Sequence, residues 1–432
     1  MKFAIIGCGY VFDHYMSTVK THPWLELAGV ADIDAGRLKR ATEFYGLHAY
    51  ASVEELLADP EMAVVANFTS IEAHFAALEA GKHVYSEKPL VMEMAEAREL
   101  MAFAAERGLH LSSAPSNALG PTSQTMWKAV RDGAVGDVRL VYAEFDDNPI
   151  YLTSPEGWRS RSGAPWPYLH EYEVGWEHAG YHLAWMCAIF GPVRSVTAFS
   201  KVTVPDKTDR PLHPADTPDF SVACLDFESG VTGRLTCSIA APYDHRMRII
   251  GNAGMVHADT YRHYHCPVMI EPFTKLNLNA RKSRSVRTMS WLGWLFGVGG
   301  RRVPLAVAPP LGGMEVIGLE AKPWHPKALI RRWKRSELGQ QDKMVGIVGL
   351  CDAVAIGRTP FPGPDFTLHL TELTLAIQAA GQEGASHRLQ TRFDPLELPA
   401  RTAAAGPDYA RYARPGWLAR KAEGLLDRMH RH

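Results

Sequence analysis

The sequence lacks several features that define whole classes of protein. No apolar run approaches the roughly 20 residues that a membrane-spanning helix requires. The 6 cysteines form no Cys-x-x-Cys pair and are irregularly spaced, which argues against a disulfide framework and against a zinc ribbon. The first residues predict a strand and not a charged leader followed by a cleavage site. We therefore expect a cytoplasmic protein whose thiols are reduced.

A strong charge of one sign is also lacking, because the formal net charge of the 432 residues is -1. This balance gives no overall attraction to nucleic acid or to acidic lipid. The apolar and charged fractions are ordinary for a globular protein, and the length suits two or three domains. The chain is therefore long enough to bury a sizeable core.

Residues 1–122 alternate short apolar strands with amphipathic helices. This alternation predicts an α/β domain of Rossmann type, with a doubly wound parallel sheet that is covered on both faces. The predicted strands are residues 2–6, 25–32, 63–69, 83–89 and 109–114.

The pattern changes near residue 122, and residues 123–390 predict a second domain of α+β class. Strand-like runs follow one another with turn residues between them, which indicates an antiparallel meander with helices on one face. Residues 391–432 form a mixed C-terminal tail that ends in a basic amphipathic stretch. The predicted strands of this domain begin at residues 138, 193, 219, 231, 245 and 255, and later helices are predicted at 342–360 and 368–381.

The turn after the first strand has the composition of a dinucleotide site. Gly7 permits a tight turn, and Gly9 lets a pyrophosphate approach the backbone at a helix N-terminus. The third small residue of the usual fingerprint is missing, because Phe12 stands there. Asp32 ends the second strand, where a carboxylate can accept both ribose hydroxyls and repel a 2′-phosphate, and Ile33 adds no cation. The pattern favours NAD over NADP, and the alternative is an ordinary strand–helix turn with a solvated aspartate.

The stretch "WEHAGYH" places His178 and His182 four residues apart, which is one helical turn. Three interpretations are open: half of a metal site, a pair of acid–base groups, or two histidines that are hydrogen-bonded in the core. A metal site needs three or more ligands, and only Glu173 and Glu177 are offered nearby. The sequence therefore favours an acid–base role over a metal.

Several motifs together resemble the Gfo/Idh/MocA family, which includes glucose–fructose oxidoreductase and inositol dehydrogenase. These motifs are the glycine turn, "TSIEAH" (69–74), "SEKP" (86–89) and "DGAVGDV" (132–138), and the resemblance covers about residues 1–260 and the helices near 343–382. It implies a Rossmann domain followed by a domain with an open, mostly antiparallel sheet. It also implies a nicotinamide cofactor and a sugar or cyclitol hydroxyl as substrate.

The resemblance also implies roles for individual residues. Lys88 would hydrogen-bond the reacting oxygen and help to move its proton, and Pro89 would aim the lysine. The family's substrate helix usually reads Asp-x-Gly-x-His, so His182 keeps the histidine while His178 stands where the aspartate is expected. The residues expected on the cofactor side are Gly7, Gly9, Tyr10, Val11, Phe12, Asp32, Ile33, Asn67, Thr69, His74, Glu87 and Lys88.

Residues near the substrate helix suggest what the second domain binds. Asn117 and Tyr181 are expected to face the substrate, although Ala118 stands in place of the family's arginine. Aromatic rings stack on sugars, and arginine grips carboxylates or phosphates. A sugar acid or nucleotide-sugar is therefore a candidate substrate, and a loop that only braces a domain interface is the alternative. The loop residues in question are Trp158, Arg159, Arg161, Trp166 and Tyr168.

We therefore predict an oxidoreductase that acts on a hydroxyl or keto group of a sugar, sugar acid, nucleotide-sugar or cyclitol. A histidine suits the proton transfer because its pKa lies near neutrality, and Lys88 would also work there if burial or neighbouring cations lower its pKa. One alternative is a lyase, epimerase or glycoside hydrolase that uses the hydride transiently. Another is a non-catalytic NAD-binding protein on the same fold.

Residues 281–335 form a strongly basic, tryptophan-rich insertion. Cations with tryptophans suit lipid headgroups, so peripheral membrane contact is one interpretation, and a substrate flap or an oligomer contact is the other. No nucleic-acid recognition motif accompanies the charge. The open antiparallel sheet predicts a homodimer or homotetramer.

Overall fold

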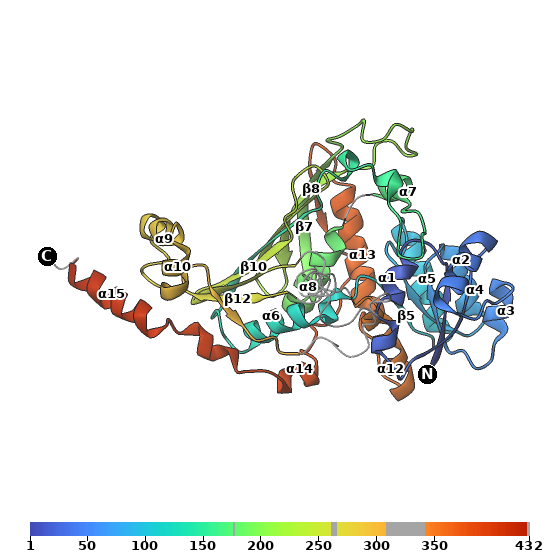
Figure 1. Cartoon of the computed structure of the whole chain (residues 1–432), viewed down its shortest axis with the longest axis horizontal. Helices are drawn as coiled ribbons and strands as arrows, with labels where there is room; N and C mark the ends of the chain where they lie inside the picture. Colours follow the sequence, from blue (N-terminus) through green and yellow to red (C-terminus); the bar gives the residue numbers. More distant parts are fainter. Residues whose placement is uncertain (176–177, 261–265, 308–341, 430–432) are drawn as a thin grey trace, which may run out of the picture.

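The chain folds around two β-sheets that lie side by side, with helices packed between and around them (Figure 1). The computed structural model describes residues 1–175, 178–260, 266–307 and 342–429. Within these residues no helix is long and apolar enough to cross a membrane.

The N-terminal sheet has five strands in the order β2-β1-β3-β4-β5, and all its neighbouring pairs are parallel. This confirms the predicted Rossmann sheet. Its strands are β1 (Lys2–Ile6), β2 (Glu26–Ala31), β3 (Val64–Asn67), β4 (His83–Ser86) and β5 (Leu111–Ser113). Its helices are α1 (Phe12–Met16), α2 (Ala35–Tyr45), α3 (Val53–Ala58), α4 (Ile71–Glu79) and α5 (Met94–Glu106), with a 3-10 turn η1 (Val19–Thr21).

Local sequence chemistry sets the turn that follows β1. Gly7 has a φ of 101°, which glycine adopts at no steric cost, and a Cβ there would lie 2.7 Å from Cγ2 of Thr69. The side chain of Asp34 caps α2 by accepting from the backbone N–H groups of Gly36 and Arg37. The turn after β1 and the start of α2 therefore both lie next to Asp32.

The second sheet has nine strands in the order β13-β12-β11-β10-β6-β9-β8-β7-β14. It is mostly antiparallel, as predicted, but β6 lies parallel to β9 and so interrupts the meander. The predicted strands are β6 (Val138–Asp146), β7 (Val193–Lys201), β8 (Phe220–Phe227), β9 (Thr232–Ser238), β10 (Arg246–Gly251) and β11 (Gly254–Asp259). Three further strands were not predicted: β12 (Val268–Pro272), β13 (Arg301–Val303) and β14 (Ala385–Arg388).

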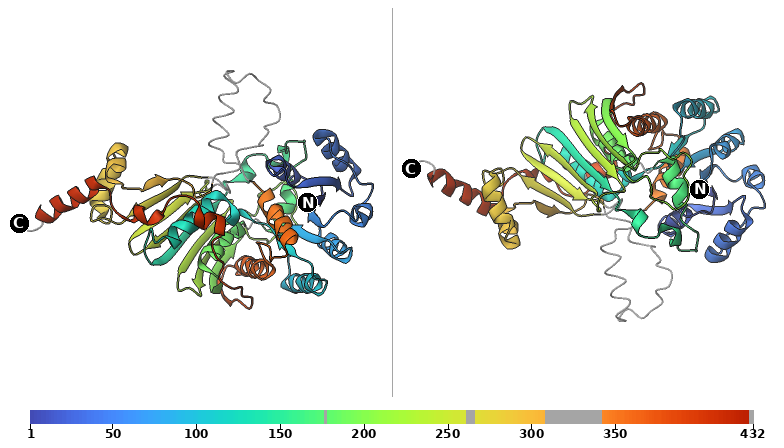
Figure 2. Two further views of the ribbon diagram at one scale, coloured as in Figure 1. Left: turned by 90° about the horizontal axis from the view of Figure 1, so that it is seen from below. Right: turned by 90° about the horizontal axis from the view of Figure 1, so that it is seen from above.

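Helices cover one face of this sheet (Figure 2). Buried and partly exposed residues alternate along the strands, as expected for a sheet with one covered face. Every residue of α8 after Gly180 is buried, and Trp185 and Phe145 contribute large side chains to this core. The helices and turns of this region are α6 (Pro121–Arg131), α7 (Tyr168–Val174), α8 (Ala179–Phe190), α13 (Pro364–Gln378), η2 (Asn117–Leu119), η3 (Ile150–Leu152) and η4 (Pro155–Gly157).

The helix α12 (Met344–Ile356) belongs spatially to the N-terminal sheet, although it follows the second sheet in sequence. Its Met344, Ile347 and Leu350 pack in one buried cluster with Phe3 and Ile5 of β1. The core around the N-terminal sheet therefore includes residues of α12 in addition to residues before 122.

The remaining elements lie between α6 and the end of the molecule farthest from the N-terminal sheet, with α14 beside α6 (Figure 1). Of the predicted insertion at 281–335, residues 281–307 are described, and residues 308–335 lie outside the described part of the chain. The remaining elements are α9 (Ala280–Arg287), α10 (Ser290–Phe296), α14 (Ala400–Ala404), η5 (Tyr409–Ala413) and α15 (Trp417–Met429).

Candidate active site

The glycine turn and the end of β2 form a preorganised polar surface. The carboxylate of Asp32 accepts from the backbone N of Cys8 at 2.7 Å and from the backbone N of Asp34 at 2.8 Å. A Cβ at Gly9 would meet no heavy atom within 4 Å, so the space above this turn is open. An open glycine turn with a carboxylate beside it fits a dinucleotide.

The other residues expected on the cofactor side shape this edge of the sheet. Asn67 holds the turn after β3, because its Oδ1 accepts from N and Oγ1 of Thr69. His74 is buried in α4, and burial lowers its pKa to about 4. Val11 and Phe12 begin α1, Tyr10 precedes them, and Ile33 is 96% exposed just after Asp32.

The aromatic loop before α7 lies beside the glycine turn. The ring of Trp166 stacks on Trp158 with centroids 5.0 Å apart and lies 6.5 Å from the ring of Tyr10. Ser162 donates from both N and Oγ to Oδ2 of Asp13 at 2.9 Å, which fastens the loop to α1. The loop thus connects the two domains at the cofactor side.

None of the five predicted substrate residues of this loop is among the residues that line the pocket beside Lys88. Tyr168 and Trp166 pack in a small cluster around Tyr172, and Arg159 donates to the carbonyl oxygens of Glu156 and Trp158. Arg161 is exposed. These contacts correspond to the interpretation of the loop as a brace.

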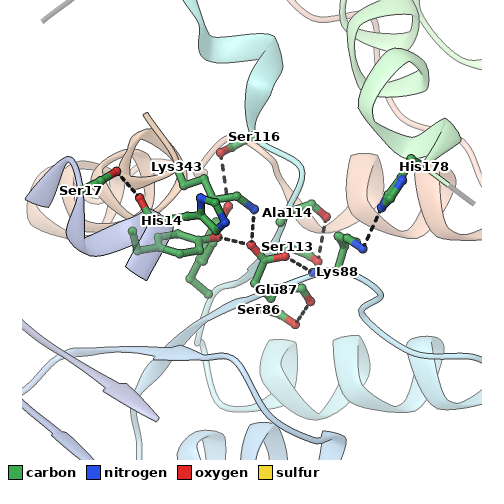
Figure 3. Close-up of polar contacts among 12 residues, drawn as sticks. His14, Ser17, Ser86, Glu87, Lys88, Ser113, Ala114, Ser116, His178 and Lys343 are labelled. Atoms are coloured by element: carbon green, nitrogen blue, oxygen red, sulfur yellow. Dashed lines mark hydrogen bonds and ion pairs between the residues drawn. The ribbon is translucent and has the colours of Figure 1, made fainter. Parts of the chain in front are cut away.

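Lys88 follows shortly after β4, and its ammonium points toward His178 of the second domain (Figure 3). Its Nζ donates to Oε2 of Glu171 at 3.2 Å and lies 3.4 Å from Nε2 of His178. Glu171 comes from α7, and His178 is the residue before the first turn of α8. Three separate segments of the chain therefore meet at this lysine.

The protonation states of these three groups follow from their surroundings. Burial opposes the charge on Lys88, but Glu171, with Tyr181 and Glu87, raises the pKa of the lysine above its ordinary value. Burial likewise opposes the charge on Glu171, yet Lys88 lowers the pKa of that carboxyl. Burial and the charge of Lys88 hold the pKa of His178 well below its usual range. The site thus contains an ammonium, a carboxylate and a neutral imidazole.

This arrangement corrects one expectation about Lys88. From the sequence, Lys88 was expected to work near neutral pH if burial or nearby cations lowered its pKa. Lys343 does oppose the charge on Lys88, but the nearer carboxylate of Glu171 outweighs it, so the pKa is raised. Glu171 was not predicted, because it lies on the short helix α7, whose sequence contains no motif.

His178 is connected to a buried carboxylate behind it. Its Nδ1 lies 3.5 Å from Oδ2 of Asp147, which directly follows β6, and Oδ1 of Asp147 lies 3.2 Å from Nε2 of His245. A carboxylate beside Nδ1 favours the tautomer with a proton on Nδ1, which leaves Nε2 to accept from Lys88. Asp147 and His245 were not predicted, because they lie at strand ends that carry no motif.

His182 and Asn117 are buried, and the side chain of each contacts a backbone carbonyl oxygen. Nε2 of His182 lies 3.3 Å from the carbonyl oxygen of His245, and burial lowers the pKa of His182 to about 3. Nδ2 of Asn117 donates to the carbonyl oxygen of Tyr181 at 2.9 Å, so it holds the first turn of α8. The histidine in contact with Lys88 is therefore His178, not His182.

Glu87 forms a second charged cluster on the other side of Lys88. Its Oε1 accepts from the hydroxyl of Tyr15 at 2.9 Å and from Nζ of Lys343 at 2.8 Å, while Oε2 accepts from the backbone N of Lys88 (Figure 3). Burial opposes the charge on Glu87, and Lys343 lowers its pKa. Lys343 was not predicted because it lies 256 residues after Glu87 in the sequence.

A mostly apolar pocket opens beside Lys88 and His178. Tyr181 lines it, and burial raises the pKa of that phenol, so Tyr181 is a neutral hydrogen-bonding group. The polar part of the wall also includes Thr371, Thr374 and Gln378 of α13, and the apolar part includes Val91, Met92, Val174, Leu370 and Leu375. Within the described residues no three His, Cys, Asp or Glu side chains are grouped so as to hold a metal ion.

Comparison with known proteins gives consistent matches in both domains. The model of the oxidoreductase family with an NAD-binding Rossmann fold (GFO/IDH/MocA) matches residues 1–114, and the model of a GFO/IDH/MocA C-terminal domain matches residues 123–257. The trans-1,2-dihydrobenzene-1,2-diol dehydrogenase of Bos taurus is 29% identical over 263 residues, which cover 59% of this chain and 73% of that protein.

Two further proteins are similar at greater distance. The inositol 2-dehydrogenase/D-chiro-inositol 3-dehydrogenase of Lactiplantibacillus plantarum is 25% identical over 297 residues, covering 66% of this chain and 77% of that protein. The aldose-aldose oxidoreductase of Caulobacter crescentus, solved with glycerol, has a TM-score of 0.62 and 21% identity, covering 90% of this chain and 99% of that chain. The last comparison shows the shared fold.

Proposed function

The chain belongs to the Gfo/Idh/MocA oxidoreductase family, and from this premise we propose that it is an NAD-dependent dehydrogenase of a small cyclic diol, cyclitol or sugar. The observation that carries the proposal is the position of Lys88, whose ammonium lies between Glu171 and His178 at the edge of a pocket. A charged donor at such an edge can bind a hydroxyl or carbonyl oxygen and exchange a proton with it.

The glycine turn and Asp32 would hold the dinucleotide, and the nicotinamide would supply the hydride acceptor or donor. Gly7 and Gly9 would let the pyrophosphate approach the backbone. Asp32 would accept from the ribose hydroxyls, which supports NAD over NADP, because a 2′-phosphate would be repelled.

In the oxidation direction Lys88 must first lose its proton. Nε2 of His178 lies 3.4 Å from Nζ and accepts its hydrogen bond, with Asp147 beside Nδ1 to fix the tautomer, so that the lysine is oriented while it gives its proton to solvent. The free amine of Lys88 then takes the hydroxyl proton of the substrate. In the reduction direction the ammonium gives its proton to the carbonyl oxygen and regains a proton from solvent.

The pocket supports a compact and partly apolar substrate. Its apolar wall suits the carbon face of a ring, while Tyr181 and the threonines of α13 offer hydrogen bonds to hydroxyl groups. Two relatives are named for compounds of this kind, a dihydrobenzene diol and inositol, and their names support the proposal. Arg159 and Arg161 lie elsewhere, so we do not include sugar acids or nucleotide-sugars in the proposal.

The test starts with nucleotide released from the purified protein, which should be NAD. The protein is then assayed for NADH formation with cyclic vicinal diols, inositols, free sugars and nucleotide-sugars. NADH accumulation with a neutral ring diol or polyol is the expected result. Product formation without net NADH would instead support transient hydride transfer, as in a lyase, epimerase or hydrolase. Failure to bind any nicotinamide dinucleotide would contradict the proposal.

A further inference from the structure

A second surface with distinct chemistry lies at the far end of the molecule (Figure 2). We define the distal surface as the exposed residues of 275–302 together with those of 417–421. Its exposed apolar side chains are large: Trp294 is 77% exposed, Trp291 64% and Trp417 59%. Leu278 is 65% exposed and Met289 is 50% exposed, so both add apolar area to this surface. Exposure of so many large apolar groups in one place is typical of a binding surface.

The distal surface also has charge of a single sign. Residues 273–303 contain seven lysines and arginines and no aspartate or glutamate. Arg281, Arg284 and Arg287 are exposed on α9, and Arg420 and Lys421 are exposed on α15. The neutral balance of the whole chain therefore conceals a strongly basic end.

Local contacts hold these side chains on ordered elements. The side chain of Asn279 caps α9 by accepting from N of Lys282 at 3.0 Å. The backbone N of Lys275 donates to Oε1 of Glu423 at 2.6 Å, which connects this region to α15. Nζ of Lys421 lies 4.2 Å from the ring centroid of Trp417. The tryptophans and cations are thus presented together on packed helices.

The chemistry of this surface selects among possible partners. A second copy that used the same surface would bring like charges together, which disfavours a symmetric dimer here. Nucleic acid would satisfy the cations, but its phosphates would leave Leu278 and Met289 in water. An anionic bilayer satisfies both, because headgroups attract the cations while tryptophans and aliphatic groups enter the interface.

We propose that the distal surface binds the anionic face of a lipid membrane. The pocket at Lys88 is lined in part by α8 and α13, and these helices lie apart from α9, α10 and α15 (Figure 1). Binding through the distal surface therefore leaves the pocket open to water. This proposal does not depend on the proposed reaction.

The test is co-sedimentation of the full chain with vesicles. Phosphatidylcholine vesicles are compared with vesicles that also contain phosphatidylglycerol, at low and at high salt. We expect binding to the anionic vesicles only, weakened by salt, with a blue shift of tryptophan fluorescence on binding. Replacement W291A/W294A should weaken binding at least about tenfold, and R281Q/R284Q should do the same.

Matched variants separate this surface from general effects. W24A removes a tryptophan that is 54% exposed in the N-terminal domain, and K201Q/R358Q removes two exposed cations elsewhere. Both controls should bind like the unchanged protein, and circular dichroism should show that all variants are folded. The proposal is overturned if anionic vesicles do not bind the protein at low salt, or if the controls weaken binding equally. Binding of a single-stranded oligonucleotide in place of vesicles would also overturn it.

Discussion

Lys88 keeps its proton in this site because its neighbours favour the charge more than burial opposes it. The carboxylate of Glu171 is the strongest of the favourable neighbours. In the proposed reaction Glu171 is a positioning residue that sets the pKa of Lys88, while His178 orients the ammonium by accepting its hydrogen bond.

Replacement of Glu171 by Gln should therefore change the pH dependence of the proposed reaction. Loss of the carboxylate lowers the pKa of Lys88, since burial and Lys343 then oppose its charge with less compensation. Carbonyl reduction needs the ammonium, so its decline at high pH should move to lower pH. Alcohol oxidation needs the free amine, so its rise should also begin at lower pH. The measurement is kcat/KM against pH in both directions.

Glu173 provides the control for this experiment, because it lies on the same helix and its carboxylate accepts from the backbone N of His213. Glu173→Gln should leave the pH profile of the unchanged protein in place. If the pH profile of Glu171→Gln coincided with that of Glu173→Gln, Glu171 would not set the pKa of Lys88.

At the scale of residues, the sequence predicted some members of the candidate site and missed others. Motifs brought Lys88 and His178 into one predicted site, and the structure places them 3.4 Å apart. Their catalytic roles remain a prediction. Glu171 comes from the short helix α7, and Asp147 and His245 come from strand ends, where nothing in the local sequence indicates which distant residues they meet.

At the scale of elements, α12 lies late in the chain but packs against the N-terminal Rossmann sheet. Ile347 is fully buried against the N-terminal sheet, and Lys343 directly before the helix contacts Glu87. The apolar run at 342–360 predicted this helix, but its period could not show which sheet it covers. The short strands β13 and β14 were missed because three or four residues do not produce a recognisable alternation.

The packing of α12 makes a testable prediction about stability. Ile347→Ala should lower the free energy of unfolding of the N-terminal domain by about 2–5 kcal/mol, because it leaves a cavity in a closed core. Ile356→Ala on the same helix should change it by less than about 0.5 kcal/mol, since Ile356 is 71% exposed. Urea denaturation of both variants measures the difference. Equal effects would show that α12 is not packed on the sheet as described.

At the scale of the whole molecule, the candidate site lies where the two domains meet. The first domain contributes the glycine turn and Lys88, and the second contributes Glu171, His178 and Asp147. The fold class followed from the alternation of strands and helices and from the family motifs. The basic end was visible as composition, but its exposure at the far end of the sheet required the structure. The predicted homodimer or homotetramer remains a prediction.

The most direct test of the account is the substitution Lys88→Met, with NAD binding and turnover measured on the same preparation. Because Lys88 is proposed to exchange the substrate's proton, kcat should fall by about 10²–10⁴-fold while the affinity for NAD is retained. Lys39→Met, which removes a surface lysine, should leave kcat unchanged. If Lys88→Met turned over substrate as fast as Lys39→Met, Lys88 would not be the proton-transfer group and the central claim would be wrong.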